Sequence, residues 1–402
     1  MADLAEKRTG SRAVAAPAED VLVSAIIPCL NEELTLGICI KKAQEAFARR
    51  GIRGEVVVGD NGSTDKSVEI AESLGARVAH QPIKGYGAAI TAAAAAAKGK
   101  FLIMADADDS YDWSQLDAFI DALEDGAELV MGNRFAGGIE AGAMPPLHRY
   151  LGNPVLSTVA RWLHRSPIRD FHCGMRGFTR EAFVRMGARS PGMEFASEMV
   201  INAHRVGLQI REVPIKLYPD KRDRPPHLRS FRDGWRHLRL IIANAPDTMY
   251  LLPGLILLAA GVFGLVSLSQ GPVMIGGEYF GIHFVAVSAM ATLIGLSAIL
   301  LGMLAKVAIA IYQPNVTGKV VPWLKRGQPL EWLVGTGSVL TAASLAADGL
   351  LVFKWLFVGG PMENTVHLSF ALTTACVAGV MMVLSGFVLK LLLDNLDDRY
   401  LS

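Results

Sequence analysis

The chain has 402 residues, of which 51% are hydrophobic and 19% are charged, and its net charge is +1. This length exceeds the usual size of one domain, and so apolar a composition is unusual for a protein that is soluble throughout. A net charge near zero argues against a nucleic-acid partner, because binding to phosphate backbones needs a clustered positive field. The four cysteines have no CxxC spacing, which gives no support to a disulfide framework or a structural zinc site.

Residues 1–20 lack the continuous apolar core of a signal peptide, so we expect a disordered N-terminus that stays in the cytoplasm. From residue 21 onward, short apolar runs alternate with stretches of helical spacing. The expected strands, in chain order, are Val21–Ile27, Glu55–Val58, Ala76–Ala79, Phe101–Ala105 and Glu128–Met131. This alternation predicts an α/β domain with a mainly parallel sheet, in which ligands bind at the carboxyl ends of the strands.

Polar clusters follow three of these strands: PCLNEE (28–33), GDNGSTD (59–65) and DADDS (106–110). Helix caps and turns favour the same residue types, which is the alternative interpretation of any single cluster. Three clusters at successive strand ends favour one shared site for an anionic ligand. The carboxylates of Asp106, Asp108 and Asp109 would repel one another without a cation among them, and Mg²⁺ or Mn²⁺ suits such oxygen ligands.

Residues 221–245 predict a basic amphipathic helix. Its apolar stripe comprises Leu228, Phe231, Trp235, Leu238 and Ile242, and its arginine stripe comprises Arg229, Arg232, Arg236 and Arg239. A helix with these two faces suits the headgroup layer of a membrane. The charge also fits an ordinary flank of a membrane span, but arginine forks match phosphate oxygens, so we expect some of these arginines to hold a phosphate.

Four apolar stretches predict an α-helical transmembrane domain at residues 246–402. They are Met249–Leu268, Phe284–Tyr312, Trp332–Val358 and His367–Leu393, each reaching the roughly 20 residues that cross a bilayer. Of their connections, only the middle one carries basic residues, namely Lys319, Lys325 and Arg326. The positive-inside rule therefore places the N-terminal domain and both termini in the cytoplasm, with the spans in the cell inner membrane. Asp348 lies near mid-span, where a charge is costly and indicates a function.

The segments IIPCLNE, VVVGDNGSTD, KGYGAA, MADADDSYD, GNRF and DFHCGMRGF occur in this order and precede the membrane spans. In this respect the chain resembles the inverting GT-A-fold glycosyltransferases of the polyprenyl-phosphate (dolichol-phosphate) mannose and glucose synthase group, over about residues 21–242. The resemblance implies a Rossmann-like GT-A domain at 21–220. It also implies transfer of a sugar from a nucleotide sugar, best taken as UDP-glucose, to polyprenyl or dolichyl monophosphate with Mg²⁺ or Mn²⁺.

The resemblance also implies roles for individual residues. Those matching the nucleotide-sugar pocket are Pro28, Asn31, Glu32, Asp60, Lys84 and Asp106. Asp106 and Asp108 match the catalytic pair that binds the metal. Those matching the binding of the lipid phosphate or the diphosphate are Arg134, Arg229, Ser230 and Arg232. Ser110 departs from some relatives, which have a Gln reaching the metal there, so the third metal ligand stays open.

Two alternatives remain at this point. The same fold could use GDP-mannose or a UDP-N-acetyl sugar as donor. In another class, the chain could be a transporter or channel subunit with a domain that senses nucleotide sugars, although most of its spans are smooth apolar helices without the paired charges of a transport site. The sequence does not fix the lipid chain length or whether a homo-oligomer forms.

Overall fold

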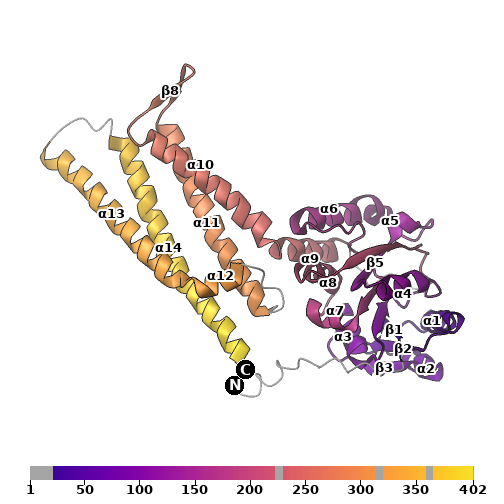
Figure 1. The fold of residues 1–402 in the computed structure, drawn as a ribbon. Coiled ribbons are helices and arrows are strands. Elements are labelled where there is room, and N and C mark those ends of the chain that lie inside the picture. Colours follow the sequence, from indigo (N-terminus) through magenta and orange to yellow (C-terminus); the bar gives the residue numbers. More distant parts are fainter. Residues whose placement is uncertain (1–20, 222–229, 313–319, 359–364, 402) are drawn as a thin grey trace. The chain divides into compact units, whose positions relative to one another are not determined.

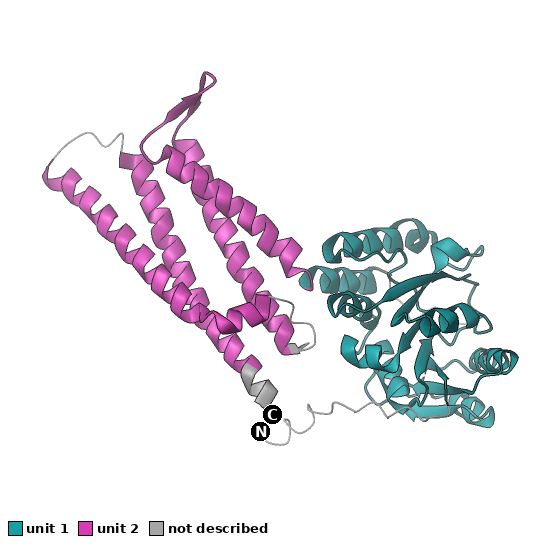
Figure 2. Ribbon diagram, viewed as in Figure 1, with its two compact units in different colours: residues 1–243 teal, residues 244–402 magenta. Residues whose placement is uncertain are grey.

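The computed structural model describes residues 21–221, 230–312, 320–358 and 365–401. The chain divides into two compact units, residues 1–243 and 244–402 (Figures 1 and 2). The segment expected to be disordered, residues 1–20, lies outside the described residues, as do Leu228, Arg229 and Lys319. The first unit is built on a β-sheet, and the second consists mainly of long apolar helices.

The first unit is built on a seven-stranded sheet of order β3-β2-β1-β4-β6-β5-β7. The strands are β1 (Val23–Cys29), β2 (Gly54–Asp60), β3 (Arg77–His80), β4 (Phe101–Met104), β5 (Leu129–Asn133), β6 (Arg176–Thr179) and β7 (Ile210–Pro214). Only β6 runs antiparallel to its neighbours in this sheet. The predicted mainly parallel GT-A-type sheet is confirmed, and the five expected strands agree within two residues at each end.

Helices cover both faces of this sheet. Those of the first unit are α1 (Leu36–Arg50), α2 (Ser67–Ser73), α3 (Tyr86–Ala96), α4 (Asp117–Glu124), α5 (Arg134–Gly137), the π-helical turn η2 (His148–Gly152), α6 (Asn153–His164), α7 (Arg180–Met186), α8 (Phe195–Arg205) and α9 (Ser230–Ala243). Alternate residues of a strand point to opposite faces, so β1 sends Ala25 and Ile27 into one core together with α1 and α4. On the other face, α3 comes so close to β2 that a Cβ at Gly59 would lie 2.2 Å from the Ala89 carbonyl oxygen.

The strand register determines which polar clusters meet. β1 pairs in parallel with β2, with Cys29 opposite Asp60, and with β4, with Ile26 opposite Met104. The carboxyl ends of β2, β1 and β4 therefore lie side by side at one edge of the sheet. The three polar clusters predicted from the sequence start at this edge.

The second unit consists of long apolar helices. Its elements are η3 (Asp247–Leu251), α10 (Leu252–Leu268), the hairpin β8 (Val273–Ile275) and β9 (Glu278–Phe280), α11 (Ile282–Tyr312), α12 (Val320–Arg326), α13 (Pro329–Phe357) and α14 (Thr365–Leu401). Four helical segments are long and apolar enough to cross a membrane, namely Asp247–Leu268, Ile282–Ile311, Pro329–Phe357 and Thr365–Leu396. They coincide with the four predicted spans.

The mid-span carboxylate, Asp348 on α13, has partners on α14. Its Oδ1 accepts a hydrogen bond from Ser369 Oγ at 3.1 Å, and its Oδ2 accepts one from Thr373 Oγ1 at 3.2 Å. The two helices also approach closely at glycines, because a Cβ at Gly337 would lie 2.6 Å from the Gly379 carbonyl oxygen. The partners that the sequence did not identify are thus two hydroxyls of the following helix.

Candidate active site

The clusters after β1 and β2 are joined by hydrogen bonds. The Asn31 side chain, on a residue with a φ of 58°, accepts from the Thr64 backbone N–H at 2.7 Å. The Glu32 backbone N–H donates to Ser67 Oγ at 2.8 Å. Asparagine tolerates this left-handed conformation better than most residues because its short side chain bonds locally. The two strand ends therefore form one continuous polar surface, as expected from the parallel sheet.

Asp60, at the end of β2, is a buried carboxylate held by several donors. It accepts from the backbone N–H groups of Ser63 at 2.9 Å and Gly62 at 3.2 Å, and His80 Nδ1 lies 3.2 Å away. Burial acts to raise its pKa, but the hydrogen bonds from Ser63, His80 and Gly62 hold the pKa of Asp60 below its usual value. The side chain therefore stays an ionised acceptor at neutral pH.

Lys84 lies against the same cluster. Its Nζ donates to the Asn61 carbonyl oxygen at 2.6 Å, and the adjacent Gly85 N–H donates to Asn61 Oδ1 at 2.6 Å. These bonds fix the start of α3 beside the β2 cluster. They also bring Tyr86, the first residue of α3, to the wall of a neighbouring cavity.

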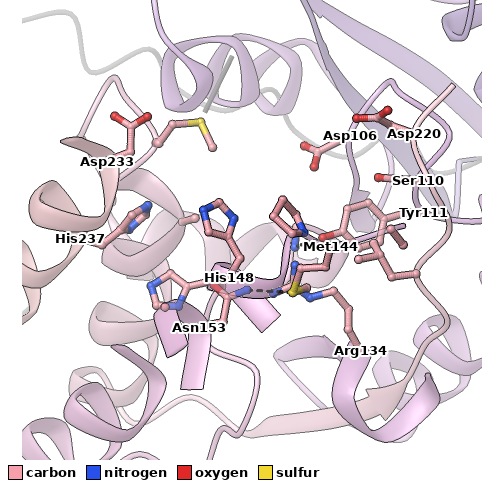
Figure 3. A pocket seen from close by; sticks show the side chains of 18 of the residues that line it. Asp106, Ser110, Tyr111, Arg134, Met144, His148, Asn153, Asp220, Asp233 and His237 are labelled. Carbon is pink, nitrogen blue, oxygen red and sulfur yellow. Dashed lines mark hydrogen bonds between the residues drawn. The ribbon is translucent and has the colours of Figure 1, made fainter. Parts of the chain in front are cut away.

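This cavity, of about 270 Å³, lies beyond the carboxyl end of β4. In Figure 3, Asp106, Ser110, Tyr111 and Asp220 lie on one side of it, and Asp233 and His237 lie on the opposite side. The residues that line it include Tyr86, Asp106, Asp108, Ser110, Tyr111, Arg134, Met144, His148, Asn153, His172, Gly174, Asp220, Asp233 and His237. Carboxylates therefore lie on two facing walls of this cavity.

The three aspartates of the DADDS segment have different surroundings. Asp106 and Asp108 line the cavity, and Asp108 Oδ1 accepts from both Ser110 N at 3.1 Å and Ser110 Oγ at 2.6 Å. Asp109 is instead buried between two cations, with Lys42 Nζ and Lys221 Nζ each 2.7 Å from its carboxylate. The repulsion expected among three carboxylates is thus relieved for Asp109 by lysines, and only Asp106 and Asp108 face the cavity.

Tyr86 hydrogen-bonds Asp106, and the glycine beside Asp106 is held by Tyr111. The Tyr86 hydroxyl hydrogen-bonds Asp106, and burial keeps the pKa of Tyr86 well above its usual value, so the phenol stays protonated. Tyr111 Oη accepts from the Gly174 backbone N–H at 2.8 Å. A Cβ at Gly174 would lie 3.0 Å from Asp106 Oδ2, so a larger residue there would have to displace the Asp106 carboxylate by a few tenths of an ångström.

Arg134, expected near the phosphates, lines the cavity but has a buried partner. Its Nε and Nη2 donate to the two oxygens of Asp170 at 2.8 and 2.7 Å, and its backbone N–H donates to Asp170 Oδ2 at 2.9 Å. Both side chains are nearly inaccessible to water, in the bidentate geometry typical of arginine and carboxylate. Arg134 therefore brings a compensated charge to the cavity, and its phosphate role stays a prediction.

The other residues expected to bind phosphate belong to the basic segment before the spans. Arg229 lies outside the described residues, and Ser230 begins α9. Arg232 is largely exposed, and its Nε lies 3.6 Å from Asp233 Oδ1. Pro28, Asn31, Glu32, Asp60 and Lys84 do not line the cavity of Figure 3, so they remain a separate expected nucleotide surface at the neighbouring strand ends.

Several residues of the cavity were not found from the sequence. They are Asp220, Asp233 and three histidines, His148, His172 and His237. Burial lowers the pKa of His237 to about 4 and that of His172 well below its usual value. The sequence does contain a pattern that indicates this face: Asp233, His237 and Ile241 are spaced four residues apart on the helix. The apolar stripe lies on the opposite face of the same helix.

Two family profiles match the chain: Glycosyl transferase family 2 over residues 24–187, and Glycosyltransferase family 2 C-terminal transmembrane region over residues 303–393. The chain is 38% identical over 371 residues to the low-salt glycan biosynthesis hexosyltransferase Agl6 of Haloferax volcanii, covering 91% of this chain and 88% of that protein. It is 37% identical over 194 residues to a dolichyl-phosphate hexose transferase of the same organism, covering 48% of this chain and 81% of that protein.

Among solved structures, the glucosyl-3-phosphoglycerate synthase of Mycobacterium tuberculosis in complex with Mn²⁺, UDP and glucosyl-3-phosphoglycerate is 22% identical to the chain. The match covers 56% of this chain and 78% of that one, with a TM-score of 0.44.

Proposed function

The chain belongs to glycosyltransferase family 2, and we propose that this enzyme transfers a sugar from a nucleotide sugar to a polyprenyl or dolichyl monophosphate. The observation that carries the proposal is a cavity lined by Asp106 and Asp108 at the end of β4, in a chain that continues into a transmembrane region. The printed name of one relative, a dolichyl-phosphate hexose transferase, supports the acceptor. UDP-glucose is the donor we favour, with GDP-mannose or a UDP-N-acetyl sugar as the alternatives.

A divalent cation fits the residues of this cavity. Asp106 and Asp108 supply carboxylate oxygens, the ligands that Mg²⁺ and Mn²⁺ prefer. Among the described residues, no group of three or more His, Cys, Asp or Glu could hold a metal ion without other ligands. Since Mg²⁺ commonly binds one or two carboxylates together with substrate phosphates, a diphosphate would complete the shell. The cation would offset the negative charge that develops on the leaving diphosphate.

The chain's own residues have complementary tasks in this proposal. Asp60 and Lys84 flank the β2 cluster where we place the nucleotide, with ionised Asp60 accepting from the base. Tyr86 and Gly174 keep Asp106 directed at the cavity, and Ser110 does the same for Asp108. Arg229, Ser230 and Arg232 belong to the segment that we expect to hold the lipid phosphate.

No general base is required for this reaction. A phosphate monoester has a second pKa near 6, so the acceptor oxygen is already largely ionised at neutral pH. That oxygen forms a bond to the anomeric carbon while the bond from this carbon to the diphosphate oxygen breaks. Attack opposite the leaving group inverts the anomeric carbon, which gives a β-linked product from an α-linked donor.

The proposed location is the cell inner membrane, with the catalytic domain and both termini in the cytoplasm. Lys325 and Arg326 at the end of α12 support this topology, as does the absence of Lys and Arg from the hairpin Val273–Phe280. A sensor subunit of a transporter, the other class considered, has no support from the family to which the chain belongs.

The test is a transfer assay with the purified full-length protein in detergent. It is incubated with polyprenyl phosphate, Mg²⁺ or Mn²⁺, and UDP-glucose, GDP-mannose or UDP-N-acetylglucosamine in separate reactions. We expect a glycolipid with one of these donors, lost on chelation and restored by metal. Absence of glycolipid with every donor contradicts the proposed function, and full turnover in excess chelator contradicts the metal.

A further inference from the structure

The inward face of α9 is polar. Asp233, His237 and Ile241 are 2%, 7% and 0% exposed, and their spacing of four residues places them on one side of the helix. This side packs towards α6 and α8, and its first two residues line the cavity opposite Asp106 (Figure 3). Towards the protein, this helix therefore buries an acid and a histidine.

A serine joins His237 to a second histidine. Ser197 Oγ, on α8, lies 2.8 Å from His237 Nδ1 and 3.2 Å from His172 Nε2. One hydroxyl has one proton and two acceptor lone pairs, so Ser197 can donate to only one of the two rings. The shorter distance suits O–H as donor and the longer one suits N–H, so we assign donation from Ser197 to His237 and from His172 to Ser197.

This assignment determines what His237 offers to a ligand. Because Nδ1 accepts from Ser197, the proton of the neutral His237 ring is on Nε2. This second nitrogen can then donate a hydrogen bond to a ligand in the cavity. The reverse assignment would leave a proton on His172 Nδ1, which is buried and makes no hydrogen bond within the described part of the chain. A buried N–H without an acceptor is rare, which favours the first assignment. His237 is then a neutral donor at neutral pH, since burial lowers its pKa to about 4.

A neutral donor beside a carboxylate suits a hydroxyl better than a phosphate. A sugar hydroxyl both accepts and donates, so it can bond His237 and Asp233 together. A phosphate dianion offers only acceptors and would lie against the Asp233 carboxylate, which forms ion pairs with Arg232 and Arg236 at 3.6 and 3.5 Å.

We propose that His237 and Asp233 bind hydroxyl groups of the transferred sugar, and that Ser197 and His172 are positioning residues that hold His237 in the donor tautomer. This inference rests on the proposed function and adds the residues that select the sugar. It places sugar recognition on α9, across the cavity from the aspartates that face the diphosphate.

The test uses variants that keep or remove a hydrogen-bond donor at the position of His237 Nε2. In His237→Gln, the amide nitrogen can occupy about the place of Nε2, whereas in His237→Asn it reaches only the place of Nδ1. Ser197→Ala removes the bond that selects the tautomer. The matched control is His164→Gln, because His164 is also buried, also has its pKa lowered to about 4 and bonds the Ile241 carbonyl oxygen at 2.9 Å, but does not line the cavity.

The readout is the contribution of the sugar to donor affinity. For each full-length variant in detergent with Mn²⁺, calorimetry gives the Kd of the nucleoside diphosphate and that of the matching nucleotide sugar. We divide the Kd of the nucleoside diphosphate by that of the nucleotide sugar, and this ratio does not depend on the fraction of the protein that is folded. We expect this ratio to fall about 5- to 100-fold in His237→Asn, less in His237→Gln and Ser197→Ala, and not in His164→Gln.

The alternatives give different results. An unchanged ratio in His237→Asn overturns the inference, as does a parental ratio near one. A raised KM for polyprenyl phosphate with an unchanged ratio would assign His237 to the phosphate instead and also overturn it. Because these ratios need no acceptor, a failure to form any glycolipid would count against the proposed function alone.

Discussion

Adjacent residues of the DADDS segment differ in what neutralises them. Asp109, with a φ of 59°, directs its carboxylate towards the ammonium groups of two lysines. Asp108 instead faces the cavity and accepts a hydrogen bond from Ser110. A substitution of Asp by Asn at either position removes one charge with little change in shape. The consequences should nevertheless differ, because the Asp109 carboxylate pairs with two lysines, whereas we propose that the Asp108 carboxylate binds the metal.

We expect Asp108→Asn to abolish transfer without lowering the melting temperature, and added metal should not restore activity. Asp109→Asn should instead reduce the free energy of unfolding by about 1 to 3 kcal/mol, because it removes a charged partner of Lys42 and Lys221. Its metal concentration for half-maximal activity should stay at the parental value. Thermal unfolding measures the stability of each variant, and transfer activity measured against metal concentration gives its metal dependence. Parental transfer by Asp108→Asn would show that the carboxylate is only part of a turn.

Residue types and their order were enough to predict Asp106 and Asp108 at a strand end. The sequence could not distinguish Asp109 from them, because its partner Lys42 lies on α1 and Lys221 lies more than a hundred residues further on. Arg134 shows the same limit. Its charge is compensated by Asp170 across 36 residues, a pairing that no local pattern indicates.

At the scale of elements, segments with an apolar run were predictable, and segments without one were not. The five expected strands and the four spans carry clear apolar runs. β6 (RGFT) has a buried arginine whose Nε donates to the Cys173 carbonyl oxygen, and β7 (IREVP) alternates weakly and ends in proline. Both become strands through pairing with β5, a tertiary effect that overrides local propensity.

The sequence predicted an apolar and a basic stripe on α9 but not its buried face, which carries Asp233 and His237. Phe231 and Trp235 are 85% and 60% exposed in the structure, as a helix at a lipid surface requires. We expect Trp235 fluorescence to be quenched by brominated lipids in nanodiscs. Trp235→Phe should remove that part of the quenching, and Trp113→Phe, at a fully buried position, should not. Equal quenching in the parent and Trp235→Phe would show that α9 lies away from the lipid.

At the scale of the whole molecule, the distribution of basic residues predicts the topology. A cysteine introduced for Gly276, in the turn between β8 and β9, should react with an impermeant maleimide added to intact cells. A tag at Ser402 should react only after permeabilisation. The buried Cys29, Cys39 and Cys173 add little background, and Cys376 is replaced by serine for this experiment. Labelling of the Ser402 tag in intact cells would reverse the proposed orientation.

The bonds from Ser369 and Thr373 to Asp348 also bear on how the protein is made. α13 has a mean hydropathy of 1.5, against 2.3 for each of the other three spans, and carries the carboxylate that α14 solvates. Emerging alone from the ribosome, α13 would present this charge to lipid at a cost of about 2.5 to 3.5 kcal/mol. We therefore expect α13 to remain at the translocon until α14 has been synthesised. The two helices would then enter the bilayer together as a helical hairpin. Chains truncated before residue 365 should insert α13 poorly in a glycosylation-mapping assay, and Asp348→Leu should restore its insertion.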